Sequence, residues 1–211
     1  MLLYKTVMNE GEDEQIIEKS RFIVHVKPVE TKEEADEFIA SVKKQYKDAT
    51  HNVPAMVIGD KMQIQWGSDD GEPQGTSGAP IVQMLVNEGI TNVALVVTRY
   101  FGGIKLGTGG LVRAYTSSAK LGILAAGICE VCEMKSVRVK VDYSIYSKLE
   151  NYRFDFDVFR ENIEYTDCVS LDLVIKPEVE EQLKTILTNI SDGKVIFVKG
   201  ESVIKKSPVS A

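Results

Sequence analysis

The amino-acid sequence predicts an α+β protein with two domains. Short β-rich runs alternate with amphipathic helical stretches along the chain, which is the pattern of a mixed fold. The 211 residues suffice for one large domain or two small ones. The last third of the chain has its own order of strands and helices. We therefore expect a boundary near residues 130–136, with domains of residues 1–133 and 134–211.

The first part of the chain predicts four strands and one helix. Thr31 and Glu34 form a capping-box pattern, and the apolar residues behind it follow helical spacing to about Lys47. The Gly59-Asp60 turn between two β-rich runs indicates a hairpin. The expected elements are strands at 14–18 and 21–26, a helix at 31–47, and strands at 55–58 and 62–66.

The next part predicts a helix, a buried strand and a second helix. Pro80 suits the first turn of a helix that Gly89 can end. Residues 92–98 are almost continuously apolar, as expected for a strand that is covered on both faces. A glycine-rich loop at 99–110 then leads into a helix that runs to about Ala126 and has a face of small residues, which permits close packing.

The remaining residues have the order βαββαβ, which is typical of the ferredoxin-like fold. Ser144 is expected to cap the first helix of this order, and Pro177 to begin the second. Residues 201–211 are expected to form a frayed tail. The expected elements are strands at 137–141, 162–165, 169–175 and 195–198, with helices near 144–152 and 177–190.

Composition predicts a cytoplasmic globular protein without a membrane span. Its apolar runs are too short to cross a bilayer, and its N-terminus lacks the pattern of a signal peptide. A net charge of -6 argues against a nucleic-acid binder that is basic over its whole surface, but leaves a local basic patch open. The cysteines, Cys129, Cys132 and Cys168, fit reduced thiols, and Cys129-x-x-Cys132 lacks the second pair that a structural zinc site needs.

The segment from Arg99 to Arg113 is the first candidate site. Its five glycines allow backbone N–H groups to face a ligand, and the start of the following helix favours an anion. Neither the P-loop nor the dinucleotide-binding pattern fits it. The residues expected to bind an anion or nucleic acid are Arg99, Lys105, Gly107, Thr108, Gly109, Gly110 and Arg113.

Two further expectations follow for this segment. Replacing Arg99 and Lys105 by Ala is expected to weaken anion or RNA binding and to leave the fold intact, since both are taken as surface cations. The alternative is a tight strand-to-helix crossing whose glycines serve packing alone, with cations that pair with an acidic loop.

That acidic loop, residues 68–80, contains Asp69, Asp70 and Glu72. Three carboxylates in four positions suit Mg²⁺, but their spacing is not that of an EF-hand, and Asp and Gly are also common turn residues. We favour a turn that pairs with the basic loop over a metal site. His51 is a candidate general base without an evident nucleophile, so we assign no catalytic residue and no cofactor.

Four segments of the first 127 residues form a specific set of motifs: Ser20-Arg21-Phe22-Ile23, Asp48-Ala49-Thr50-His51-Asn52, the acidic loop from Ser68 to Gly78, and Asn92 to Tyr115 with the core TRYFGG-x-KLG-x-GGLVRAY. With these motifs, residues 1 to about 127 resemble the YigZ/IMPACT family. One departure is that family members usually carry a Cys and an aromatic residue after the His-Asn pair, where this chain has Val53-Pro54-Ala55-Met56. Chemistry that used that Cys would fail here.

The resemblance implies an N-terminal domain of the ribosomal-protein domain-2-like type, similar to domain IV of elongation factor G. It also implies a ferredoxin-like C-terminal domain similar to domain V of that factor. Eukaryotic relatives regulate translation by binding a partner protein. The resemblance therefore implies a non-catalytic cytoplasmic regulator of translation that binds RNA, the ribosome or a translation-linked protein. The alternative is an enzyme that acts on a phosphorylated small molecule held at the glycine-rich loop.

Overall fold

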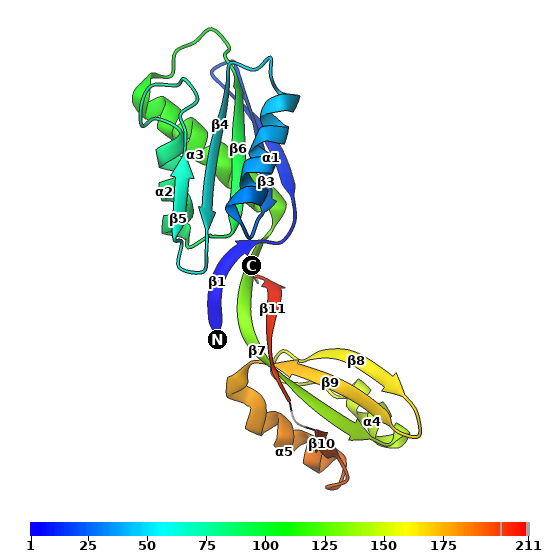
Figure 1. The fold of residues 1–211 in the computed structure, drawn as a ribbon. Helices are drawn as coiled ribbons and strands as arrows, with labels where there is room; N and C mark the ends of the chain where they lie inside the picture. The colour runs from blue at the N-terminus through cyan, green and yellow to red at the C-terminus, as the bar shows by residue number, and fades with distance from the viewer. Residues whose placement is uncertain (199, 210–211) are drawn as a thin grey trace. The chain divides into compact units, whose positions relative to one another are not determined.

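The computed structural model describes residues 1–198 and 200–209 of the chain (Figure 1). The chain forms two compact units, whose main parts are residues 3–131 and 132–205. Both units combine helices with antiparallel sheets, so the protein is a two-domain α+β chain, as the sequence predicts. None of the helices within these described residues has the length and apolarity needed to cross a membrane.

The N-terminal unit is built on a five-stranded sheet in the order β2-β3-β6-β4-β5, in which every neighbouring pair is antiparallel. The central strand β6 is buried over all but its last residue, because helices cover both faces of the sheet. This burial explains the apolar run that predicted the strand. The strands are β2 (Gly11–Ile17), β3 (Ser20–Pro28), β4 (His51–Ile58), β5 (Ile64–Gly67) and β6 (Val93–Tyr100).

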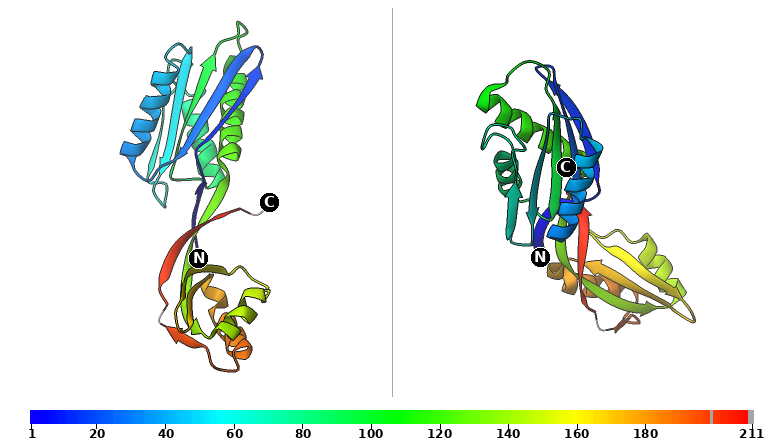
Figure 2. Two further views of the ribbon diagram at one scale, coloured as in Figure 1. Left: turned by 90° about the vertical axis from the view of Figure 1, so that its right-hand side faces the viewer. Right: turned by 45° about the horizontal axis from the view of Figure 1, so that its top comes forward.

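Three helices cover this sheet, with α1 (Lys32–Gln45) on one face and α2 (Gly78–Glu88) and α3 (Gly107–Ala126) on the other (Figure 2). The predicted cap of α1 is confirmed, since the hydroxyl of Thr31 accepts a hydrogen bond from the Glu34 amide at 3.2 Å. The helix ends at Gln45, two residues before the expected end.

Small residues bring α3 close to the sheet. A Cβ added to Gly122 would lie 2.6 Å from a methyl carbon of Val24 and 2.7 Å from one of Val26, both buried on β3. The predicted small face of this helix, which includes Ala114, Ser118 and Ala119, is buried as well. The close approach packs the C-terminal half of α3 directly against β3.

The C-terminal unit has the ferredoxin-like order. Its sheet runs β10-β7-β9-β8 with antiparallel neighbours, and α4 and α5 contribute to a core against one face. Pro177 opens a short 3-10 turn that precedes α5, which places the second helix as expected. The elements are β7 (Ile128–Val141), α4 (Tyr143–Asn151), β8 (Phe159–Tyr165), β9 (Val169–Ile175), α5 (Glu180–Ile190) and β10 (Ile196–Val198).

Two expectations from the sequence are wrong, and one strand was not expected. Residues 202–208 form β11 (Ser202–Pro208) and not a frayed tail, because they pair with β7. The strand β1 (Leu2–Val7), which was not expected, also pairs with β7. The N-cap position of α4 is Asp142 and not Ser144, which lies inside the helix.

We expect Gly122→Ala to destabilise the N-terminal unit by about 1–2 kcal/mol. The cost of overpacking, about 1–3 kcal/mol, exceeds the helix propensity that Ala adds, about 1 kcal/mol. Urea unfolding followed by the fluorescence of Trp66, the single tryptophan, measures the change. Gly109→Ala in the same helix is the control, because a Cβ there has no neighbour nearer than 3.7 Å. Equal stability of the two variants would contradict the close packing of α3 on β3.

Candidate functional site

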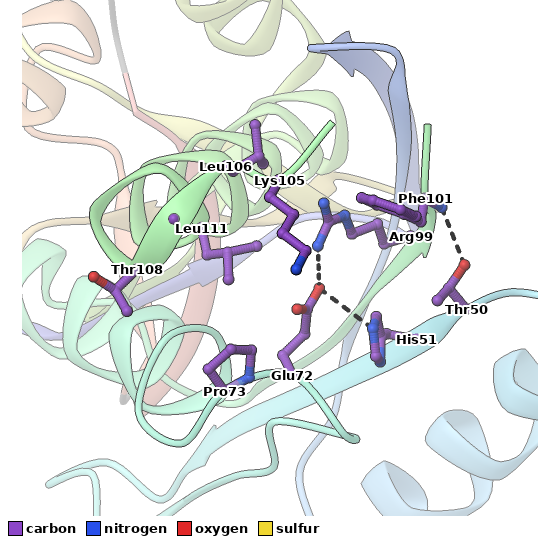
Figure 3. Close-up of a pocket in the computed structure, with 11 residues that line it drawn as sticks. Thr50, His51, Glu72, Pro73, Arg99, Phe101, Lys105, Leu106, Thr108 and Leu111 are labelled. Carbon is purple, nitrogen blue, oxygen red and sulfur yellow. Dashed lines mark hydrogen bonds and ion pairs between the residues drawn. The ribbon is translucent and has the colours of Figure 1, made fainter. Parts of the chain in front are cut away.

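A cavity of about 440 Å³ lies at the end of the N-terminal unit where β6 runs into the loop before α3 (Figure 3). Residues from the start of β4, the acidic loop, the end of β6 and the start of α3 form its wall. Segments far apart in the sequence thus meet here because the sheet brings their ends together. The cavity is lined by Thr50, His51, Glu72, Pro73, Arg99, Phe101, Lys105, Leu106, Gly107, Thr108 and Leu111.

Arg99 and Glu72 form a buried ion pair in the wall of this cavity. Nη1 of Arg99 donates to Oε1 of Glu72 at 2.6 Å, and Nη2 donates to the hydroxyl of Ser20 at 3.2 Å. The guanidinium carbon lies 5.3 Å from the ring centres of both Phe22 and Phe101. Only 4% of Arg99 is exposed, so the expectation that it is a free surface cation is wrong. The pair joins the acidic and basic loops.

One oxygen of Glu72 collects most of the contacts. Oε1 also accepts a hydrogen bond from the hydroxyl of Tyr115 at 2.8 Å, and Nε2 of His51 lies 3.7 Å away. Burial, and then the hydrogen bond to Glu72, raises the pKa of Tyr115 well above its usual range, so this phenol stays protonated and donates. Within the described part of the chain, Oε2 of Glu72 receives no hydrogen bond.

Asp69 anchors the acidic loop to the start of α2. Its Oδ1 accepts from the amides of Ser77 and Gly78 at 3.1 and 2.9 Å, and its Oδ2 accepts from the amide of Gly75 at 2.7 Å. Burial acts to raise the pKa of Asp69, but these hydrogen bonds together lower it below its ordinary value. The carboxylate is therefore used in fixing the loop.

Asp70 points to a third set of partners. Its carboxylate accepts from Nζ of Lys43 at 2.6 Å and from the amide of Asn52 at 2.7 Å. Nδ1 of His51 donates to the carbonyl oxygen of Asp70 at 2.8 Å, which leaves Nε2 facing Glu72. The three carboxylates thus diverge, and no group of three metal-ligating side chains is found among residues 1–198 and 200–209.

The start of α3 supplies the positive side of the cavity. The helix begins at Gly107, and its N-cap residue Leu106 gives no side-chain acceptor to the amides of the first turn. Lys105 is exposed and lines the cavity together with Gly107 and Thr108. These amides and the Lys105 ammonium remain able to meet an anion.

The structure separates the other predicted basic-loop residues from the cavity wall. Gly109 and Gly110 lie in the first turn of α3 but do not line the cavity. Arg113 is exposed, and its Nη1 lies 3.7 Å from the position of a Cβ on Gly109, so its charge lies beside the helix start. Of the predicted set, Arg99, Lys105, Gly107 and Thr108 therefore meet at the cavity.

Sequence reasoning missed several residues of the site. Tyr115 lies on the buried face of α3, where its spacing indicates only core packing, although it ends the glycine-rich motif. Ser20 accepts hydrogen bonds from both Arg99 and the Gly102 amide at 3.2 Å, and its place in the Ser20-Arg21-Phe22-Ile23 motif was the available signal. Phe101 is 47% exposed at the cavity, and an aromatic side chain between a buried strand and glycines was an available signal.

Comparison with known proteins assigns both units to described families. The family model of the Impact N-terminal domain matches residues 18–123, and that of a domain of unknown function, DUF1949, matches residues 139–194. IMPACT family member YvyE of Bacillus subtilis is 40% identical over 94% of this chain and 91% of its own length. IMPACT family member YigZ of Escherichia coli is 46% identical over 47% of this chain and 50% of its own.

A solved structure supports the same fold. A crystal structure described as that of a hypothetical protein matches with a TM-score of 0.58 and 29% sequence identity. The match covers 94% of this chain and 97% of the other.

We expect Arg99→Ala to cost about 3–5 kcal/mol of stability, because it leaves the buried Glu72 carboxylate without its cation. Lys105→Ala, the exposed control from the same segment, should change stability by no more than about 0.5 kcal/mol. Urea unfolding of Arg99→Ala, of Glu72→Ala and of the double variant with both changes gives the coupling free energy of the pair. A double variant that loses the full sum of the two single losses would show that the pair is not coupled.

We expect Asp69→Ala to cost about 0.5–2 kcal/mol at neutral pH, because α2 loses its capping acceptor. The folded-state pKa of Asp69 is lowered, so this stability is present above the unfolded value of about 3.9 and is lost as pH falls through the folded pKa. Urea unfolding of wild type and variant from pH 7 to pH 3 measures the difference between their free energies of unfolding. This difference should therefore become smaller below about pH 4.

Asp60→Ala is the control, since the Asp60 carboxylate in the β4–β5 turn makes no side-chain hydrogen bond among the described residues. The difference in free energy of unfolding between Asp60→Ala and wild type should not change between pH 7 and pH 3. A gap for Asp69→Ala that stays constant down to pH 3 would contradict the assigned role.

Proposed function

The chain belongs to the IMPACT family, and on this premise we propose that it is a non-catalytic, translation-related regulator that binds RNA or the ribosome. The observation that carries the proposal is a local basic surface at the α3 end of the N-terminal unit. We call it the loop-end surface and define it by Lys19, Phe101, Lys105 and Arg113. Its chemistry suits a phosphate backbone with unpaired bases.

The cations of the loop-end surface are available to a partner. Lys19, Lys105 and Arg113 are exposed, and none of the three pairs with a carboxylate in the part of the chain that the structure describes. The turn that carries Lys19 touches the glycine-rich loop, because a Cβ on Gly102 would lie 2.0 Å from the backbone of Lys19. The cations therefore lie at one end of the N-terminal unit, although the net charge of the whole chain is -6.

Exposed apolar side chains accompany these charges. Phe101 is 47% exposed and Ile104 is 37% exposed in the same loop. An aromatic ring beside cations is the arrangement on which single-stranded nucleic acids stack, because every base has a π face. This combination favours an RNA partner over a partner attracted by charge alone.

Lys19→Ala, Lys105→Ala and Arg113→Ala combined should weaken binding to single-stranded RNA and to ribosomes by about tenfold or more at low salt. Each lost phosphate contact also lowers the salt dependence, by about 0.7 in the slope of log K against log salt, or about 2 for three contacts. Fluorescence anisotropy from 50 to 200 mM salt with a labelled RNA measures both quantities.

The control is the triple variant Lys32→Ala, Lys61→Ala, Lys120→Ala, which removes the same charge from the start of α1, the β4–β5 turn and the later part of α3. Its binding should stay within about twofold of wild type if charge alone does not drive binding. The absence of binding by wild type to both RNA and ribosomes at 50 mM salt would overturn the proposal, as would equal losses in the two triple variants.

One observation favours a second candidate, an enzyme acting on a phosphorylated small molecule. Nε2 of His51 lies 3.7 Å from Oε1 of Glu72 in the wall of the cavity, and an imidazole beside a carboxylate is a common acid–base pair. A thermal-shift screen with nucleotides and sugar phosphates, with and without Mg²⁺, tests it. A ligand present at a hundred times its dissociation constant stabilises the folded state by about 2.7 kcal/mol. No shift with any compound would exclude this candidate.

A further inference from the structure

The cavity contains a hydrogen-bond acceptor to which none of the described residues donates. Only 4% of the Glu72 side chain is exposed, and Oε1 takes the hydrogen bonds from Arg99 and Tyr115. Oε2 has no partner among the described residues, and Glu72 lines the cavity (Figure 3). Oε2 is not one of the buried side-chain atoms that lack a partner, so it stays open to the cavity, where a ligand group can donate a hydrogen bond to it.

The surroundings of Glu72 decide what kind of donor fits. Arg99 already neutralises the carboxylate at 2.6 Å, so the site does not require a second cation. Lys105 lines the same cavity and would repel a ligand ammonium group. A neutral hydroxyl is therefore the donor that this acceptor suits best.

The start of α3 provides an anion site beside that acceptor. The amides of its first turn have no side-chain acceptor from the N-cap residue, and the helix is 20 residues long. A Cβ on Gly107 would meet no heavy atom within 4 Å, so the backbone there is open to a ligand. With Lys105 alongside, this opening matches a phosphate group.

The remaining wall is apolar and includes an exposed ring. Phe101, Leu106 and Leu111 line the cavity, and the Arg99 guanidinium lies 5.3 Å from the centre of the Phe101 ring. A base can stack on such a ring. The volume of about 440 Å³ lies within the range of about 300–1,000 Å³ that is usual for small-molecule sites.

Building on the proposed RNA-binding function, we infer that this cavity seats one unpaired ribonucleotide. Its phosphate lies at the first turn of α3 beside Lys105, its base stacks on Phe101, and its ribose 2′-hydroxyl donates a hydrogen bond to Oε2 of Glu72. The site thereby distinguishes RNA from DNA, because only the ribose carries this donor.

The test compares three labelled oligonucleotides of the same sequence by fluorescence anisotropy with the full chain. One has ribose, one has 2′-deoxyribose, and one has 2′-O-methyl ribose, which keeps the oxygen but loses the donor. The ribose form should bind about tenfold or more tightly than the other two, as for a lost hydrogen bond to a charged group. Equal affinity for all three would overturn the inference and leave RNA binding itself intact.

Two variants and one control test whether the oligonucleotide binds in the cavity. Phe101→Ala should weaken the binding of all three oligonucleotides by a similar factor, because stacking does not depend on the sugar. Trp66→Ala is the control: this ring is 44% exposed on β5, and its loss should leave the affinity for each oligonucleotide unchanged. Glu72→Gln should reduce the preference for ribose, because its amide keeps one acceptor for Arg99 and Tyr115 and turns a donor to the cavity. If Glu72→Gln does not fold, the comparison of oligonucleotides with wild type decides alone.

A competition experiment distinguishes RNA from a free nucleotide as the ligand of the cavity. Competition by adenosine monophosphate that exceeds competition by its 2′-deoxy form would support the site with a free nucleotide as its ligand. A preference for ribose in the oligonucleotides without such competition would support the site with RNA as its ligand. Absence of any RNA binding would instead overturn the proposed function, so the two failures remain distinct.

Discussion

The buried ion pair between Arg99 and Glu72 fixes the arrangement of the segments around the cavity of the N-terminal unit. A guanidinium and a carboxylate that are both withdrawn from water must stay together, because either one alone is strongly unfavourable. Arg99 stands at the end of the central strand, and Glu72 comes from the loop before α2. Tyr115 on α3 donates to the same carboxylate oxygen. One contact therefore sets the mutual positions of a strand, a loop and a helix, and the cavity is the space between them.

The acidic loop delivers Glu72 to this position through its own hydrogen bonds. Asp69 binds the amides at the start of α2, and Asp70 binds Lys43 and the amide of Asn52. Asp70 has a positive φ of 47°, a conformation that the loop must hold at some cost in energy. The neighbouring carboxylates thus act as supports for the third. Their divergence explains how a short acidic sequence can produce one buried charge and no shared cation position.

Much of the fold could be predicted because local patterns and burial agree. The apolar run of β6, the cap at Thr31 and the βαββαβ order correspond to the structure. Predictions failed where a partner distant in sequence decides the outcome. The polar strand β11 is ordered by its pairing with β7, and Arg99 is buried because Glu72 neutralises it. The pattern of a single segment does not indicate such a distant partner. The sequence could therefore predict where the cations of the glycine-rich loop lie, but it could not predict which of them is neutralised by a carboxylate.

The pairing of β7 with both β1 and β11 has a consequence for the order in which the chain is made. During synthesis, β7 emerges long before residues 201–208, and the amide of Ser136 donates to the carbonyl of Glu201 only when that late segment is present. Part of one edge of β7 therefore has no neighbouring strand until residues 202–208 have been made. A chain released early would display an open strand edge, which is a surface that other strands can join. The edge of β7 is therefore covered only in a chain that has been made through β11.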